Sequence, residues 1–219
     1  MAFKLLISGE SNAGKTSLTR NLKDTLVISH DGKPYQFAIP HGLMTDSSTA
    51  EAVISFTESK ALAYKDKYGK LPANIVFDSV SRIYDSFYDS CNRRFTGFTI
   101  YSQLDREIKQ FADFLEELLA NGINIIIISH ALYDAETSKY NLVGKGSFAK
   151  LGGFLSVVDN SIFITAKNDK RVLYFRSTKY PARTLLEDLP DSTPVENFAL
   201  QDHIAKLSQH ADTASEFTL

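Results

Sequence analysis

The sequence is short of the features that mark secreted and membrane-spanning proteins. It has one cysteine, Cys91, so no disulfide can form within the chain, which fits a reducing compartment. No apolar run approaches the ~20 residues that a membrane-spanning helix needs. A glycine-bearing motif already begins at Gly9, which leaves no room for an amino-terminal signal peptide. We therefore expect a cytoplasmic protein with no membrane partner.

The chain also lacks an excess of either charge. It carries 24 Lys and Arg against 26 Asp and Glu, a net charge of −2, so nothing attracts nucleic acid to the molecule as a whole. Any such binding needs a local basic patch. A length of 219 residues with 43% hydrophobic residues fits one α/β domain with its own core. We expect this domain over residues 1–210 and a mobile tail over 211–219.

Apolar runs alternate with segments of helical spacing along the chain. Several of the runs are β-branched without alternation, as in strands buried on both faces. The expected strands are Phe3–Ser8, Thr25–Ser29, Tyr35–Ile39, Asn74–Asp78, Ile123–Ser129, Ser161–Thr165 and Arg171–Ser177. The expected helices are Lys15–Lys23, Thr49–Lys67, Val80–Asn92, Leu104–Asn121 and Val195–Gln209. This order predicts a mainly parallel sheet covered on both sides, with an antiparallel hairpin formed by the last two strands.

The first expected strand runs directly into G-x-x-x-x-G-K-T, residues 9–16, and a helical pattern follows. Glycines let successive backbone N–H groups face one anion, and the start of the helix adds its dipole. Lys15 is expected to reach the outer phosphates of ATP, and the Thr16 hydroxyl to ligate Mg²⁺. The expected nucleotide-binding residues are Gly9, Glu10, Ser11, Asn12, Ala13, Gly14, Lys15, Thr16 and Ser17.

The strand Asn74–Asp78 ends in a carboxylate that is expected to hold Mg²⁺ opposite Thr16. The next residue is Ser79, where many nucleotide hydrolases have the glutamate that polarises the attacking water. The base must then come from elsewhere, or hydrolysis is slow. Asp31 or His30 would face the γ-phosphate if the second strand lay beside the first, although the same segment also reads as a hairpin turn.

The most apolar run, Ile123–Ser129, is followed by His130. A polar residue at that position can sense the γ-phosphate, or it can simply close the strand with a hydrogen bond. We favour the sensor.

These motifs together resemble the RecA-like ATPases. The resemblance is nearest to short phage-encoded nucleotide-binding proteins that keep only the RecA core and act in single-strand annealing or recombination. It covers residues 1–186 and implies a three-layer P-loop fold. It assigns catalytic positions to Lys15, Asp78 and the sensor His130, while the family's glutamate after the second strand is replaced here by His30-Asp31.

The same resemblance implies single-stranded DNA as a partner, in the host cytoplasm if the protein is phage-encoded. It leaves open a single-strand-binding protein and a second copy of the chain as further partners. One DNA loop would carry Arg93 and Arg94 among aromatics, although part of that segment has helical spacing typical of core. The other would be a long loop over residues 133–153 carrying Lys139, Lys145 and Lys150, which could equally be a lid over the nucleotide.

A basic segment over residues 167–183 follows. Lys179 and Arg183 are our candidates for a finger that reaches the nucleotide of a neighbouring copy. The same charges could instead be a solvated sheet edge that blocks strand addition.

Three other functions remain open at this point. A GTPase is disfavoured because no N-K-x-D motif follows Ile123–Ser129. A small-molecule kinase would need arginines that close over the acceptor, for which Arg93 and Arg94 are the candidates. A nucleotide-gated binding module with little hydrolysis is favoured by the missing glutamate. The sequence favours a slowly hydrolysing ATPase over these three.

Overall fold

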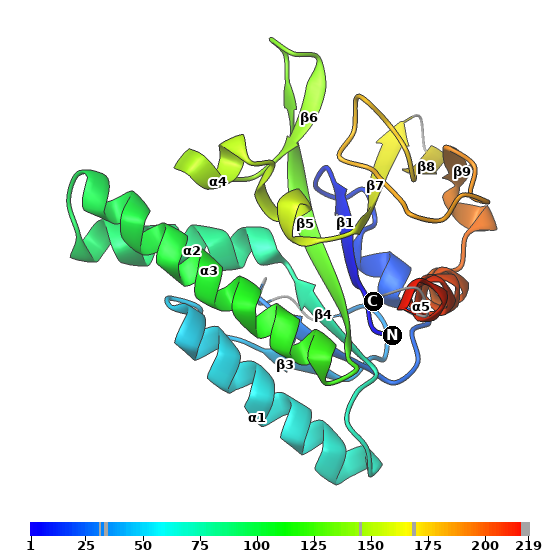
Figure 1. Cartoon of the computed structure of the whole chain (residues 1–219), viewed down its shortest axis with the longest axis horizontal. Helices are drawn as coiled ribbons and strands as arrows, with labels where there is room; N and C mark the ends of the chain where they lie inside the picture. Colours follow the sequence, from blue (N-terminus) through cyan, green and yellow to red (C-terminus); the bar gives the residue numbers. More distant parts are fainter. Residues whose placement is uncertain (31, 33–34, 145, 168–169, 216–219) are drawn as a thin grey trace.

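The computed structural model describes residues 1–30, 32, 35–144, 146–167 and 170–215. Nine strands within these residues form one sheet in the order β3-β2-β4-β5-β1-β7-β8-β9, with β6 pairing with β5 (Figure 1). The strands are β1 (Lys4–Gly9), β2 (Thr25–Ser29), β3 (His41–Leu43), β4 (Asn74–Asp78), β5 (Asn124–Asp134), β6 (Lys139–Leu142), β7 (Asn160–Lys167), β8 (Lys170–Tyr174) and β9 (Ser192–Pro194).

Helices cover both faces of this sheet. The α-helices are α1 (Ala50–Tyr68), α2 (Val80–Arg94), α3 (Phe98–Ala120), α4 (Gly146–Lys150) and α5 (Leu200–Ser215). Three short 3₁₀ helices are η1 (Thr16–Thr19), η2 (Gly153–Val157) and η3 (Val195–Asn197). None of the helices in the described ranges combines the length and the apolar character needed to cross a membrane.

Strands β3, β2, β4, β5, β1 and β7 run parallel, and β8 and β9 continue the sheet antiparallel. The fold predicted from the sequence is therefore confirmed as an α/β P-loop nucleotide hydrolase fold with an antiparallel carboxyl-terminal hairpin. The hairpin pairs β7 with β8, from Phe163 opposite Tyr174 to Lys167 opposite Lys170.

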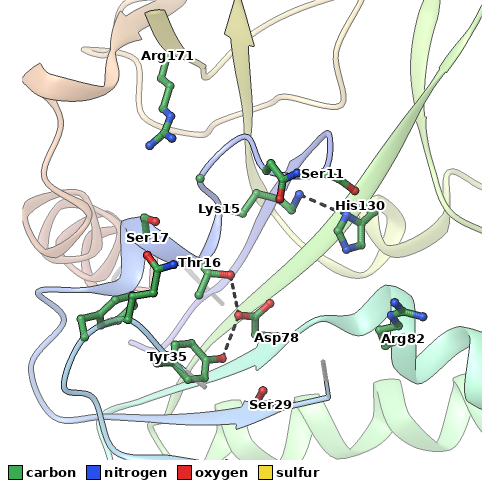
Figure 2. Close-up of a pocket in the computed structure, with 14 residues that line it drawn as sticks. Ser11, Lys15, Thr16, Ser17, Ser29, Tyr35, Asp78, Arg82, His130 and Arg171 are labelled. Carbon is green, nitrogen blue, oxygen red and sulfur yellow. Dashed lines mark hydrogen bonds between the residues drawn. The ribbon is translucent and has the colours of Figure 1, made fainter. Parts of the chain in front are cut away.

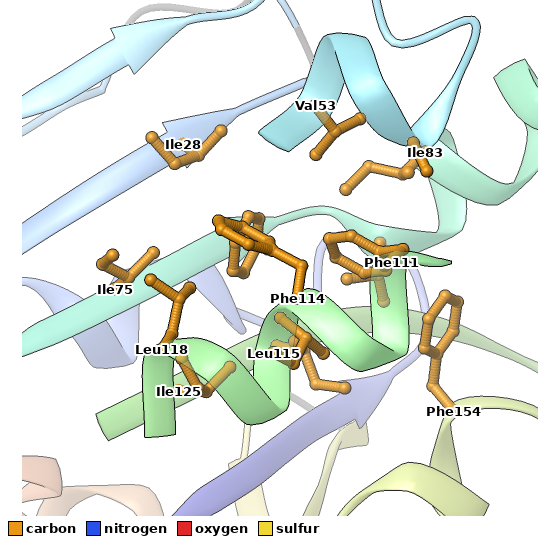
Figure 3. Close-up of a cluster of buried hydrophobic side chains, with 14 of the residues drawn as sticks. Ile28, Val53, Ile75, Ile83, Phe111, Phe114, Leu115, Leu118, Ile125 and Phe154 are labelled. Carbon is orange, nitrogen blue, oxygen red and sulfur yellow. The ribbon is translucent and has the colours of Figure 1, made fainter. Parts of the chain in front are cut away.

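The central strands are apolar at consecutive positions because each face of the sheet is covered. One face packs against α1, α2 and α3, and Figure 3 shows Ile75 and Ile125 of the sheet facing Phe114 and Leu118 of α3. The other face packs against α5, where Ile126 lies in the same buried cluster as Ile204. Burial on both faces leaves the carboxyl ends of the strands as the place where polar side chains gather.

Strand β5 lies between β1 and β4. In this register Gly9 at the end of β1 is opposite His130, and Asp78 at the end of β4 is opposite Ile128. The phosphate loop (residues 9–16), His130 and Asp78 therefore meet at one edge of the sheet.

Some expected elements are absent. The segment 15–23 was predicted to be a helix, but its one regular element is the single turn η1. Its backbone bonds span three residues, from Leu18 N to Lys15 O and from Arg20 N to Ser17 O, and the Thr19 hydroxyl takes the Thr16 carbonyl at 2.8 Å. A hydroxyl that binds the backbone competes with the helical ladder.

The strand predicted over Tyr35–Ile39 is a loop, and pairing with β2 begins only after Pro40, at β3. The long loop predicted over 133–153 is also wrong, because β5 continues to Asp134 and turns back as β6, and α4 follows. At the carboxyl terminus, α5 extends through Ser215, into the segment predicted to be a mobile tail, and residues 216–219 lie outside the described part of the chain.

Candidate nucleotide site

A cavity of about 440 Å³ opens where β1, β4 and β5 end. Its walls come from the phosphate loop, the segment 35–37, the start of α2 and β8 (Figure 2). This volume lies within the range of ligand pockets in proteins, about 300–1,000 Å³. The lining residues are Ser11, Asn12, Gly14, Lys15, Thr16, Ser17, Ser29, Tyr35, Gln36, Phe37, Asp78, Arg82, His130 and Arg171.

Gly9 stands where a side chain has no room, and Gly14 lies close to the flexible side chain of Arg171. A Cβ on Gly9, whose φ is +156°, would lie 2.2 Å from the carbonyl oxygen of Ile164 on β7. A Cβ on Gly14, whose φ is +100°, would lie 3.1 Å from Nη1 of Arg171. The loop is thus packed closely against β7 and β8, as a backbone cradle for phosphate requires.

Six of the nine expected nucleotide-binding residues line the cavity, and three do not. Gly9 packs on β7, Ala13 is buried in the core beneath α5, and Glu10 accepts a hydrogen bond from Tyr140 at 3.1 Å. The helix that was predicted to follow the loop, and to add its dipole to the phosphate site, is a single 3₁₀ turn. The cradle therefore depends on the amides of the loop itself.

Lys15 is almost fully buried, with 6% of its surface exposed. Its ammonium donates to the carbonyl oxygens of Gly9 at 2.9 Å and Glu10 at 2.7 Å, and lies 3.4 Å from Nδ1 of His130. Figure 2 shows Lys15 and His130 pointing toward each other across the loop. The lysine is held where an outer phosphate would replace carbonyl acceptors.

The two residues predicted to hold the metal, Thr16 and Asp78, are hydrogen-bonded to each other. The Oδ2 of Asp78 accepts hydrogen bonds from the Thr16 hydroxyl at 2.8 Å and from the Tyr35 hydroxyl at 3.0 Å. Hydroxyl and carboxylate oxygens are the ligands that Mg²⁺ prefers. Thr16 and Asp78 therefore form a pair that fits this ion.

A chain of hydroxyls holds β5 at Ser129 and His130, inside the strand. The backbone N–H of His130 donates to Ser81 Oγ at 2.8 Å, and Ser81 Oγ lies 3.1 Å from Ser129 Oγ. Since Ser81 lies in the first turn of α2, which begins at Val80, this network links His130, the predicted sensor, to the segment that follows Asp78, the predicted metal ligand. A change at His130 can reach the start of α2 through it.

Asp31 or His30 was predicted to face the γ-phosphate if the second strand, β2, lay beside β1. The structure shows that β2 does not lie beside β1. Strand β2 pairs with β3 and β4, so β4 and β5 separate it from β1. Ser29 at its end nevertheless lines the cavity. Burial lowers the pKa of His30 to about 4, and its ring nitrogens have no hydrogen-bond partner within the described ranges. Asp31 lies outside those ranges.

The sequence did not single out Tyr35, Arg82 or Arg171. Figure 2 shows Arg171 extending from β8 toward the phosphate loop, opposite Tyr35 and Asp78. In the sequence, Arg171 was noted only as one of several basic residues in the segment 167–183. Its position on the strand that follows β7 is the signal that could have distinguished it from the others. Nothing in the sequence pointed to Tyr35 as a site residue, because its segment has the pattern of a strand.

The predicted DNA-binding arginines lie away from this cavity, at the end of α2. Both are exposed; Arg94 donates to Ser90 O at 3.2 Å and forms an ion pair with Glu107 Oε1 at 3.8 Å. Phe98 nearby is 92% exposed. Figure 1 places this α2–α3 turn at the far side of the molecule from β8.

The lysines of the second predicted loop fall on other elements. Lys139 is on β6 and Lys150 ends α4, both exposed, and Lys145 lies outside the described residues. Lys139 lines a second cavity, between β6 and the segment 178–181.

Neither candidate for a trans-acting finger lines the nucleotide cavity of its own chain. The Lys179 ammonium lies over the rings of Tyr133 and Tyr180, 6.0 and 5.5 Å from their centroids. The Arg183 guanidinium donates to Leu155 O at 2.9 Å and to Val158 O. Arg183 would have to give up these bonds to reach a neighbour.

Comparison with known proteins gives a family for the part of the chain that contains the nucleotide cavity. The curated proteins searched include no match to the chain. A family model described as an AAA domain matches residues 1–184, a span that contains every residue lining the nucleotide cavity. Within that span the chain has the character of a nucleotide-binding P-loop ATPase, and it therefore belongs to the AAA domain family.

Proposed function

We propose that the protein is a RecA-like ATPase that binds ATP with Mg²⁺, hydrolyses it slowly and acts on single-stranded DNA in phage-type recombination or strand annealing. The observation that carries the nucleotide part is the meeting of Lys15, Thr16 and Asp78 around one cavity. Thr16 and Asp78 are 2.8 Å apart, and Lys15 lies beneath the glycine cradle.

The fit of ATP is supported by the shape and the donors of the cavity. The loop amides and Lys15 would hold the β- and γ-phosphates, and Thr16 with Asp78 would hold Mg²⁺. When bound, Mg²⁺ neutralises charge that develops on the phosphates. Arg171 supplies a further cation from β8, and no described residue accepts a hydrogen bond or forms an ion pair with it.

Slow hydrolysis is supported by the scarcity of carboxylates. Asp78 is the one acidic side chain among the described residues lining the cavity, and Thr16 and Tyr35 already share its Oδ2. His130, beside Lys15, is then the nearest candidate for ordering an attacking water. The same observation favours a second candidate function, a nucleotide-gated binding module with little turnover.

A small-molecule kinase receives less support than at the level of the sequence. Its acceptor-closing arginines would be Arg93 and Arg94, which lie at the far end of α2 from Asp78 and do not line the cavity. An acceptor bound at the cavity would therefore not meet them.

The DNA part rests on exposed cations around the nucleotide edge and on the resemblance to RecA-like proteins. Lys139 and Lys150 project from β6 and α4, which follow β5 directly. Lysines on a surface attract a phosphodiester backbone with an affinity that falls as salt rises.

The deciding experiment is ATP turnover with and without a deoxythymidine oligomer, over a series of protein concentrations, with GTP as competitor. We expect slow turnover that the oligomer raises and Lys15→Ala abolishes. Turnover below detection, with ATP still bound, would select the nucleotide-gated module. Failure to bind the oligomer at low salt, with and without ATP, would remove the DNA part.

A further inference from the structure

A second cavity, of about 460 Å³, lies beside the nucleotide site. It is enclosed by β6, by the segment around α4 and η2, and by Thr178–Pro181. Figure 1 shows the β5–β6 hairpin standing above the sheet near β7 and β8. His130 lines the nucleotide cavity, and β5 continues past it to Asp134 before the chain turns back as β6, so both cavities lie at the carboxyl-terminal end of the parallel strands.

Two lysines, Lys139 and Lys179, line this cavity. Lys139 and Lys179 are both exposed, and neither forms an ion pair within the described ranges. Glu136, the acid nearest to Lys139 in sequence, forms no ion pair within the described ranges, and Asp134, which lies opposite Lys139 in the β5–β6 pairing, has a carboxylate that accepts from Thr137 at 2.8 Å and from Asn141 at 3.3 Å. Two unpaired cations beside one hollow favour a phosphate-bearing ligand.

Aromatic rings stand next to these cations. Tyr140 and Tyr180 line the cavity with ring centroids 5.4 Å apart, and Tyr180 stacks on the buried Phe163 at 4.4 Å. Tyr133, 52% exposed, packs against Tyr140. Cations combined with a fixed aromatic platform suit a single strand, whose phosphates and bases both find partners.

One side chain connects this cavity to the phosphate loop. Tyr140 donates its hydroxyl to Glu10 Oε1 at 3.1 Å and its backbone N–H to the carbonyl of Lys179 at 2.9 Å. Glu10 in turn accepts the Lys15 ammonium on its own carbonyl at 2.7 Å. Three consecutive contacts therefore run from Lys179 to the lysine that faces the phosphates.

We propose that this second cavity anchors the phosphate backbone of a single nucleic-acid strand, and that Tyr140 transmits its occupancy to the phosphate loop. The inference rests on the proposed function, since it concerns how the strand acts on the ATP site. An anchored strand holds β6 and Lys179 in place and so keeps Tyr140 on Glu10. The carboxylate of Glu10 is then held away from the incoming triphosphate.

The strand and ATP must affect each other equally, because coupling between two binding sites is reciprocal. Couplings of this kind are typically about 5- to 150-fold in affinity. We expect a deoxythymidine oligomer to tighten the binding of a non-hydrolysable ATP analogue at least about fivefold, and the analogue to tighten the oligomer by the same factor.

Two variants separate the site from the relay. Lys139→Gln combined with Lys179→Gln should weaken oligomer binding at least about tenfold and flatten its salt dependence, while the analogue alone binds as before. Tyr140→Phe keeps the ring and removes the hydroxyl, so it should leave oligomer affinity without ATP intact and reduce the coupling factor to about one. The matched control is Lys65→Gln with Lys67→Gln on α1, which removes the same charge at a distance.

The outcomes fall into distinct classes. An oligomer that never binds the wild type overturns the DNA part of the proposed function and this inference with it. Oligomer binding that survives loss of Lys139 and Lys179 overturns only the site, and coupling that survives Tyr140→Phe overturns only the relay. Without oligomer, calorimetry should count one bound ATP analogue per chain. A second one, lost with the two lysines, would make the cavity a nucleotide site and overturn strand binding there.

Discussion

The Thr16 hydroxyl donates a hydrogen bond to Asp78 Oδ2 at 2.8 Å, although 62 residues separate the two along the chain. The contact exists because β1 and β4 flank β5, which brings Thr16, at the end of the phosphate loop, to Asp78 at the end of β4. The Tyr35 hydroxyl shares the same carboxylate oxygen at 3.0 Å.

Asp78→Asn tests the metal role of this pair. The amide keeps the shape but loses the charge that attracts Mg²⁺, so we expect Mg²⁺ to support ATP binding only at concentrations about tenfold higher or more. Titration with a fluorescent ATP analogue at several Mg²⁺ concentrations measures the effect. Binding in EDTA should be the same in both proteins, and an unchanged Mg²⁺ requirement would remove Asp78 from the metal site.

Arg171→Ala tests whether β8 contributes a cation to the nucleotide of its own chain. The guanidinium borders Gly14, so we expect ATP affinity to fall about tenfold and adenosine affinity to stay the same. Arg171→Lys should recover part of the loss, since it keeps the charge without the fork. Equal losses for ATP and adenosine would indicate damage to the loop instead of a lost phosphate contact.

Mixing Arg171→Ala with Lys15→Ala, at an ATP concentration too low for either variant alone to turn over detectably, distinguishes action in the same chain from action on a neighbour. If Arg171 serves its own chain, combining Arg171→Ala with Lys15→Ala restores no turnover, because each chain still lacks one part of its site. Recovered turnover in the mixture would show that the arginine acts between chains.

Gly9→Ala tests the close approach of the loop to β7. A methyl group 2.2 Å from the Ile164 carbonyl cannot be accommodated without backbone movement. Overpacking of this kind costs about 1–3 kcal/mol, which should lower the free energy of unfolding measured in urea. Gly122→Ala, where a Cβ meets nothing within 4 Å, is the control for strain from a positive φ alone.

His203 predicts a dependence of stability on acid. The ring is 3% exposed between Phe175 and Phe198, and burial, followed by the nearby Lys206, lowers its pKa to about 4. The unfolded chain takes up the proton near its ordinary value of 6.5 and the folded chain only near 4, so the free energy of unfolding falls as pH drops through this window. At about 1.4 kcal/mol per pH unit, the full loss is roughly 3 kcal/mol.

Urea unfolding at intervals between pH 7 and pH 4 measures this loss. His30 has a lowered pKa of about 4 as well and contributes in the same direction, so the comparison must be made with His203→Phe. In that variant the free energy of unfolding should still fall with pH because of His30, but the part of the fall that His203 causes should be absent. Parallel curves for the two proteins would contradict the assignment to His203.

Local sequence was enough to predict the strands that are formed by one unbroken apolar run. Strands β2 and β4 begin and end where they were predicted, because each is an unbroken buried run between polar residues. The segment 15–23 failed for a local reason of another kind, since the Thr19 hydroxyl takes a backbone carbonyl that a continuing helix would use.

The remaining parts of the site depend on which strands are neighbours, and the sequence does not contain that information in any one segment. Lys15 and Thr16 could be predicted because residues 9–16 form a specific motif, and Asp78 because its strand is paired with that motif. Arg171 joins them only because β8 follows β7 at the side of β1, and Tyr35 because its loop folds back over Asp78. Long-range packing of this kind places side chains that no local pattern distinguishes.

The most direct test of the account is a crystal structure with a non-hydrolysable ATP analogue and Mn²⁺ in place of Mg²⁺, since Mn²⁺ can be located by its anomalous scattering. The account predicts one strong anomalous peak between Thr16 and Asp78, with the triphosphate in the cradle formed by residues 9–16. An empty cradle, or an ion bound away from Asp78, would contradict it.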